Sequence, residues 1–208
     1  TTASSNTGIG FQALGSNTTG YSNAAVGQNA LYTNTTGHSN SAFGLSALTA
    51  NTTGAGNVAL GHQSLHAQTT AAGNTAIGNN AGKEITTGGY NVFVGEESGS
   101  YSTNTITGIQ NTFLGSYTGG TASNTTRANV IGHGVVGESE YTTIGSGTSD
   151  IRAANGNVTW ATVSDERYKK DIVDSTAGLS FVNALQPRTF KYKNLGELPS
   201  TFSAYKAD

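Results

Sequence analysis

The stretch "NAAVGQNAL", residues 23–31, recurs along the chain with the same order of residue types. Each copy has Asn, a variable residue, a small or apolar residue, a large apolar residue, Gly, two variable residues, a small residue, and then Leu or Gly. Seven copies begin at Asn6, Asn23, Asn40, Asn57, Asn74, Asn91 and Asn111. The first six are 17 residues apart, the seventh follows after 20, and a shortened copy begins at Asn129. This period predicts a repeat architecture in which each unit covers the next.

The residue types of the repeat favour short strands and turns over helices. Gly and Asn occur in every copy, and both are poor residues for a helix interior. The stretches "NTTG" that begin at Asn17, Asn34 and Asn51 have the composition of turns. The chain is therefore predicted to be mainly β, a parallel β-solenoid or β-roll built of 17-residue coils.

The apolar positions of the repeat predict which side chains face the interior. We expect one large side chain per coil to stack into an internal ladder of Ile9, Val26, Phe43, Leu60, Ile77, Val94 and Leu114. Small residues flank this ladder: Ala25, Ala42, Ala59 and Ala76 on one side, and Ala13, Ala30 and Ala47 on the other. So few large side chains bury little area at about 25 cal/mol per Å2. We therefore expect the alanines to let sheets of neighbouring subunits approach closely in a parallel homotrimer.

The composition excludes several classes of protein and site. The 208 residues contain no Cys, so neither disulfides nor thiolate metal sites are available. A net charge of -2 argues against a nucleic-acid partner, which ordinarily needs a basic face. No apolar run approaches the roughly 20 residues of a membrane helix, so membrane insertion is not expected. No motif predicts a cofactor or a metal ion.

The distribution of charge divides the chain into three predicted parts. The first charged residue is Lys83, and fifteen of the 22 charged residues lie in 150–208. We predict a solenoid shaft over 1–137, a β neck over 138–163 and a short α+β segment over 164–208. In the neck, "TTIG" and "NVTWATV" are the strand candidates. Trp160 is expected to anchor the packing there.

The segment "ATVSDERYKKDIVD", residues 161–174, differs in composition from the repeats because half of its residues are charged. One interpretation is a helix whose N-cap is Ser164, with acidic residues near its positive end and Lys169 further along. A second interpretation is chemical. If Ser164 precedes the helix, its hydroxyl lies within reach of Lys169, and a Ser-Lys pair is a known variant of nucleophile and base.

The repeats resemble two families of fibrous proteins. "NAAVGQNAL" is similar to the head repeats of trimeric autotransporter adhesins, and the "NTAIG" and "NTTG" elements are still more similar to repeats of phage tail fibres and tailspikes. The second resemblance implies a homotrimeric fibre in the virion tail that contacts other tail proteins and a host-surface glycan or protein receptor. The first implies an adhesin on a bacterial cell surface.

The segment after the neck resembles the intramolecular chaperone, or endosialidase-type auto-processing domain, at the C-terminus of phage tailspikes. "SDERYKKDI" matches the signature that opens this domain, and "LSFVNALQPRTFKYK" matches its next segment. The resemblance implies that Ser164 is a nucleophile, that Lys169 is its base, and that the bond between Val163 and Ser164 is cleaved once. A later segment of the type "GFIAQEV" is absent, so we expect the domain to be truncated at Asp208.

Other candidate sites are weaker. Turn-region residues that could contact a receptor are Tyr21, Tyr32, His38, His62 and His66. The pair His62 and His66 has no carboxylate nearby in sequence, which disfavours a metal site. Glu96 and Glu97 are adjacent and are expected to point apart, which disfavours glycoside hydrolysis. The consecutive Thr pairs disfavour an ice-binding array, and the lack of Asp before Asp150 disfavours a calcium-binding solenoid.

Overall fold

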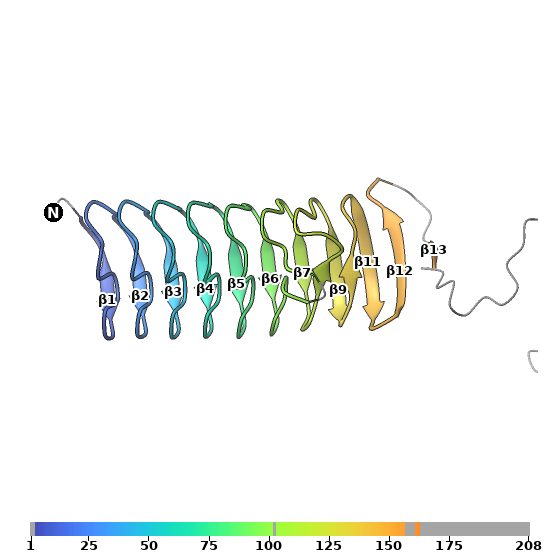
Figure 1. Cartoon of the computed structure of the whole chain (residues 1–208), viewed down its shortest axis with the longest axis horizontal. Helices are drawn as coiled ribbons and strands as arrows, with labels where there is room; N and C mark the ends of the chain where they lie inside the picture. The colour runs from blue at the N-terminus through green and yellow to red at the C-terminus, as the bar shows by residue number, and fades with distance from the viewer. Residues whose placement is uncertain (1–2, 102, 157–160, 163–208) are drawn as a thin grey trace, which may run out of the picture. The chain divides into compact units, whose positions relative to one another are not determined.

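The computed structural model describes residues 3–101, 103–156 and 161–162. Within these ranges the chain consists of short strands and turns, without a helix. Figure 1 shows the strands side by side, with β1 to β7 each joined to the next by one coil of chain. The strands are β1 (Thr7–Ile9), β2 (Ala24–Val26), β3 (Ser41–Phe43), β4 (Val58–Leu60), β5 (Thr75–Ile77), β6 (Val92–Val94), β7 (Thr112–Leu114), β8 (Gly119–Gly120), β9 (Asn129–His133), β10 (Val136–Gly137), β11 (Tyr141–Ser146), β12 (Ser149–Ala154) and β13 (Ala161–Thr162).

One sheet of eleven strands runs the length of this structure, and a pair formed by β8 and β10 lies beside it. From β1 to β11 the neighbours in the large sheet are parallel, and each strand pairs with the strand one coil later, as in Thr7 with Ala24. Strands β12 and β13 then pair antiparallel. The predicted parallel β-solenoid is confirmed, with about eight turns spaced by about 17 residues.

The prediction of which side chains face inward is wrong. The middle residue of each strand from β2 to β7 points into the coil and is buried, and in β2 to β5 that residue is alanine. The large apolar residue that follows it points outward instead. We call these outward side chains the outer row: Ile9, Val26, Phe43, Leu60, Ile77, Val94, Leu114, Ile131 and Ile144.

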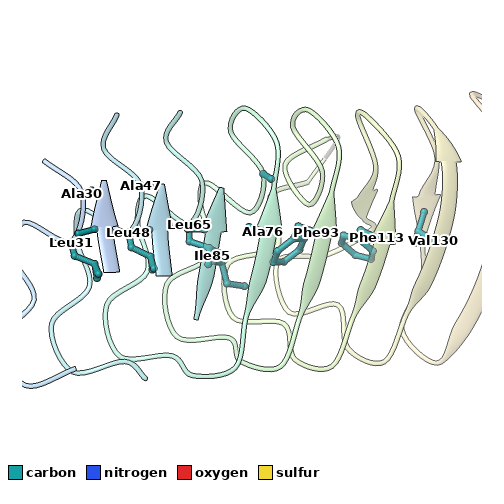
Figure 2. Packing of buried hydrophobic residues seen from close by; sticks show 14 of the residues in the cluster. Ala30, Leu31, Ala47, Leu48, Leu65, Ala76, Ile85, Phe93, Phe113 and Val130 are labelled. Atoms are coloured by element: carbon teal, nitrogen blue, oxygen red, sulfur yellow. The ribbon is translucent and has the colours of Figure 1, made fainter. Parts of the chain in front are cut away.

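The narrow interior of the coil explains this inversion. Leu31, Leu48 and Leu65 enter the same interior from the opposite wall, and they are fully buried (Figure 2). They hold a left-handed backbone conformation, with φ of 52°, 51° and 49°. Since these leucines fill the space, only alanine fits across from them.

In the coils of β6 and β7 the large and the small side chains exchange walls. Phe93 and Phe113 replace the inward alanine and are fully buried. In the same coils glycine replaces the opposing leucine: a Cβ on Gly99 would lie 2.4 Å from the ring of Phe93. The alternation of Leu and Gly at the end of the repeat is therefore a volume compensation.

A ladder of buried asparagine amides runs beside the inward row. Asn57 shows the arrangement: its backbone N–H and its Nδ2 both donate to Oδ1 of Asn40 at 3.0 Å, and its Nδ2 also donates to the carbonyl of Ala71 at 3.0 Å. Its own Oδ1 accepts the backbone N–H of Asn74 at 2.9 Å. Each amide thus joins three successive coils, which explains why Asn opens the repeat.

The "NTTG" stretches form bends, as predicted, and contain a second amide ladder. Nδ2 of Asn34 donates to Oδ1 of Asn17 at 2.9 Å, and Nδ2 of Asn51 donates to Oδ1 of Asn34 at 2.8 Å. The ladder ends at Gln68, whose longer side chain instead accepts a hydrogen bond from Asn74 at 2.8 Å. Oδ1 of Asn51 consequently has no hydrogen-bond partner.

The neck follows its prediction in part. "TTIG" lies in β11 as expected, and β13 is the described part of "NVTWATV". The phase assigned to Asn129 is wrong: it pairs with Thr112 as the first strand residue, and Ala128 takes the ladder position by donating its N–H to Asn111 at 2.9 Å. Trp160 and the segment 164–208 lie outside the described residues. The boundaries of the three parts remain predictions.

The substitution Asn57→Ala tests the amide ladder. It removes the acceptor of the buried Asn74 N–H and the donor to Ala71, so the free energy of unfolding should fall by about 3 kcal/mol. Asn79→Ala, on an exposed turn, should change it by less than about 0.5 kcal/mol. Urea unfolding followed by circular dichroism measures both. Equal losses of unfolding free energy in the two variants would show that a ladder asparagine contributes no more to stability than an exposed one.

The substitution Gly61→Ala tests the stacking of the glycines that follow the strands. A Cβ at Gly61 would lie 2.3 Å from the carbonyl oxygen of Gly78, and its φ of +135° is strained for other residues. We expect a loss of about 4 kcal/mol in the free energy of unfolding. Gly56, at φ +67°, has open space around it, so Gly56→Ala should cost only about 1 kcal/mol. A loss no greater at Gly61 than at Gly56 would contradict the close stacking.

Candidate functional site

The outer row is the most unusual surface of the described residues. Except for Val26 and Val94, which are half-buried, its side chains are 36–59% exposed. They repeat once per coil along one face of the sheet. The residues that share this face, two positions before each outer-row residue, are Thr7, Ala24, Ser41, Val58, Thr75, Val92, Thr112, Asn129 and Thr142. No side chain of either row carries a charge.

The outer row continues across the change from parallel to antiparallel pairing. Ile144 in β11 pairs directly with Ile151 in β12, and the two side chains are 37% and 41% exposed. Ile151 pairs in turn with Thr162 in β13. The apolar face therefore extends to β12, which pairs with β13.

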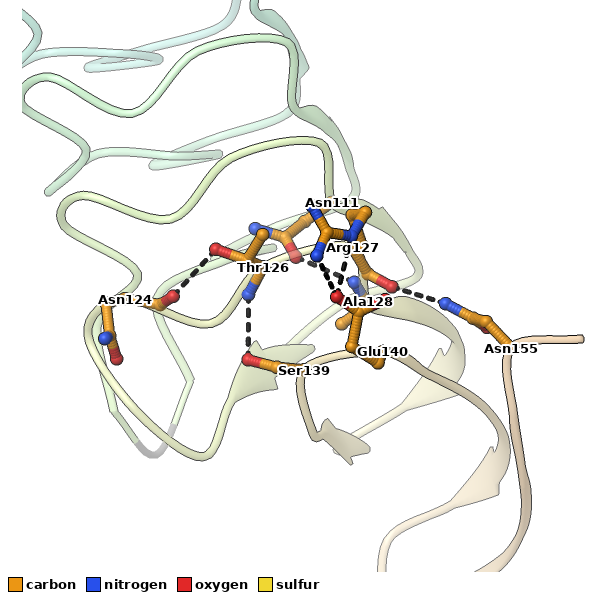
Figure 3. A network of polar contacts seen from close by, with 8 residues as sticks. All are labelled: Asn111, Asn124, Thr126, Arg127, Ala128, Ser139, Glu140 and Asn155. Carbon is orange, nitrogen blue, oxygen red and sulfur yellow. Dashed lines mark hydrogen bonds and ion pairs between the residues drawn. The ribbon is translucent and has the colours of Figure 1, made fainter.

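A polar network ties the neck to the last coil (Figure 3). Asn155, after β12, donates from Nδ2 to the carbonyl of Arg127 at 2.7 Å, and its backbone N–H donates to the carbonyl of Glu140 at 2.7 Å. The N–H of Thr126 donates to Oγ of Ser139 at 3.0 Å. These bonds fix the end of the solenoid against the strands that follow it.

An ion pair completes the network. The guanidinium of Arg127 donates to the carboxylate of Glu140, which lowers the pKa of Glu140 and raises that of Arg127. Both groups are exposed, so the pair contributes little stability. A second pair joins Arg152 and Glu138 at 2.9 Å.

The predicted catalytic residues lie outside the described residues. This holds for Ser164, Lys169 and Val163, so their separation and the cleavage site stay predictions. The nearest described element is β13, which ends at Thr162.

The five predicted receptor-contact residues occupy three different positions of the coil. Tyr21 and His38 are equivalent in adjacent coils, and their rings stack at a centroid distance of 4.7 Å. His62 lies near Oδ1 of Asn79, with 3.3 Å from its Nδ1. Tyr32 and His66 lie at a third position, the residue after the buried leucines. They do not form one patch.

His66 is half-buried, next to the fully buried Leu65. Burial lowers the pKa of His66, and Lys83 lowers it further, while Glu84 acts in the opposite direction. The residues that the structure describes contain no group of three or more His, Cys, Asp or Glu placed to hold a metal ion. Nor do those residues form a helix with the length and apolar character needed to cross a membrane.

Sequence reasoning missed an aromatic cluster near the C-terminal coils. Tyr117 contacts Tyr101 edge to face at 6.1 Å and His133 at 5.7 Å. Glu96 beside Tyr117 raises the pKa of its hydroxyl. The only signal in the sequence was the 20-residue step between Asn91 and Asn111, whose extra residues shift the chain near Tyr101.

The comparison with protein families supports the resemblance of the C-terminal segment to the intramolecular chaperone domain. A family model described as the chaperone of endosialidase matches residues 164–203, beginning at the predicted nucleophile. No curated protein and no solved structure matches the chain significantly. The C-terminal segment is thus similar to an intramolecular chaperone, and it follows a β-solenoid.

Proposed function

We propose that this chain is a structural and host-attachment fibre of a phage tail, assembled as a parallel homotrimer with the help of its C-terminal chaperone segment. The observation that carries the proposal is the chaperone match that begins at Ser164, directly after a solenoid with an uncovered apolar face. A rod of about eight coils suits a fibre, because stacked coils give length without a large core.

The topology gives the chaperone its task. Each parallel strand pairs only after a whole coil has closed, and several chains must also find a common register. Such non-local pairing is slow and exposes apolar surface to aggregation. A C-terminal segment that holds the chain ends together would align the equivalent coils of the three chains. This alignment shortens the time during which apolar surface is exposed to aggregation.

Cleavage would then release the segment once. In the proposed step, Oγ of Ser164 attacks the carbonyl carbon of Val163 while neutral Lys169 takes the hydroxyl proton. The peptide C–N bond breaks, the amine of Ser164 receives a proton, and an ester remains between Val163 and the serine oxygen. One water hydrolyses this ester and leaves a carboxylate on Val163. The shaft afterwards persists because its unfolding is slow.

Attachment would use many weak contacts. Three copies present each exposed position of the coil three times and repeat it along the rod. Contacts of low affinity to a host-surface glycan or protein receptor then add through avidity. The extracellular virion tail is the place that this function requires, with other tail proteins as further partners.

The cleavage proposal is tested on the full-length protein that contains residues 1–208. We expect mass spectrometry to find a fragment that ends at Val163. Ser164→Ala and Lys169→Ala should each slow its formation by about 1,000-fold or more, because nucleophile and base act as a unit. Light scattering should show that both variants still assemble.

The matched controls are Ser175→Ala and Lys170→Ala, which change the same residue types nearby. Both should cleave at the wild-type rate. An intact wild-type chain, or cleavage that persists in Ser164→Ala, would refute the assigned chemistry.

A further inference from the structure

We propose that the outer row, with the small residues beside it, is the interface with a second copy of this chain, parallel and in register. This rests on the assembly in the proposed function and assigns the face that mediates it. The assignment is the reverse of the expectation from sequence, in which the alanines lay between subunits. Apart from Ala13, which is partly buried, those alanines are fully buried within the single chain, as Ala42 and Ala47 show, so they are not available for contact.

The chemistry of the face favours association. Two rows of uncharged side chains cover nine parallel strands, and charged residues of the solenoid, such as Lys83 and Glu97, lie in the turns instead. Proteins that keep a sheet face in water usually place polar or charged side chains on it. Exposed Leu60 and Ile77 have no charged neighbours on the strands beside them, and the polar residues on this face are short ones such as Ser41.

The size of the face is in the range of a subunit interface. Nine strands at about 4.8 Å give a strip about 38 Å long. At a width of roughly 12 Å for two rows it covers about 450 Å2, against the few hundred Å2 that monomers commonly expose. A standard interface buries about 800 Å2 per partner, so the strip supplies about half. Phe11 and Leu45, each two residues after an outer-row side chain, are also 68% and 43% exposed.

The repeat selects the chain itself as the occupant. A partner must present uncharged side chains at the same step of about 4.8 Å over some 38 Å. Another copy has the same spacing because it has the same sequence. The outer row of one copy can then lie against the smaller residues beside the outer row of its neighbour, at the same height along the solenoid. Contacts of this kind between unlike rows close into a ring of copies.

The direction of the copies follows from the two ends. The apolar face reaches Ile151 beside β13, close in sequence to the chaperone match. Only parallel copies bring their chaperone segments to the same end, where these segments can act together. An antiparallel pair would place them about 38 Å or more apart.

Charge substitutions test the face. In the full chain, Leu60→Asp and Ile77→Asp each bury a carboxylate in the interface, so half-dissociation should need at least about 100-fold higher protein concentration. The controls Thr53→Asp and Thr70→Asp put the same charge on exposed bends of neighbouring coils. They should keep the wild-type midpoint. Light scattering across a dilution series gives the molar mass, and circular dichroism reports the fold.

Single cysteines test direction and register, including the case in which the aspartates prevent folding. The chain has no cysteine, so Ile9→Cys or Ile131→Cys introduces the only thiol. With a short bis-maleimide, each variant alone should give covalently linked chains, and the exposed control Thr19→Cys should give at least 10-fold less. Linkage only when the first two variants are mixed would show antiparallel copies and overturn the proposal.

The outcomes separate this inference from the proposed function. If the wild type is a multimer whose mass all four aspartates leave unchanged, the face is wrongly assigned while the trimeric fibre stands. If the wild type has the 21.1 kDa mass of one chain at all concentrations, the assembly fails together with the inference. Dissociation by the outer-row aspartates alone, with linkage at both cysteines, supports the inference.

Discussion

The width of the coil is the constraint on which the rest of the structure depends. Two walls of chain face each other across an interior with little space for large side chains. Most of the coils from β2 to β7 hold one, either leucine from the turn side or phenylalanine from the strand, whereas the coil with Ala76 and Gly82 buries Ile85. The other wall must then supply alanine or glycine. Because the strand is three residues long, a small middle residue leaves the large apolar residue after it on the outside. The apolar outer face is thus a consequence of a narrow core.

Buried amides compensate for the small apolar core. A coil that buries an alanine and a leucine gains only a few kcal/mol from apolar area. The asparagine ladders add hydrogen bonds in every coil, and they satisfy backbone groups that would otherwise be buried without partners, such as the N–H of Asn74. These bonds also fix the register, since each amide contacts the equivalent residue one coil away. A single chain is therefore specific in shape but leaves a large apolar area uncovered.

The sequence alone predicted the solenoid and its period, because seven copies in phase leave few alternatives. It did not predict which face of the strand is inside. Successive side chains of a strand point to opposite faces, so a shift of one residue exchanges the inner and outer side chains. The rule that large apolar residues are buried therefore assigned Val26 rather than Ala25 to the core. A signal was present: Phe93 and Phe113 occur in coils that have glycine where other coils have leucine. The aromatic cluster around Tyr117 was not predictable, because it depends on where the longer coil places Tyr101.

Two features of the candidate site are neighbours in the sequence. The apolar face continues to β12, and the chaperone match begins two residues after β13. A sequence motif predicted Ser164 and Lys169 as catalytic residues. The exposure of the outer row, by contrast, was recognised only from the fold. The central claim, that other copies cover this face, is tested most directly by hydroxyl-radical footprinting of the wild-type particle. Phe43, 39% exposed in the single chain, should be oxidised as slowly as the fully buried Phe93. Oxidation of Phe43 at the rate of a freely exposed phenylalanine would contradict the account.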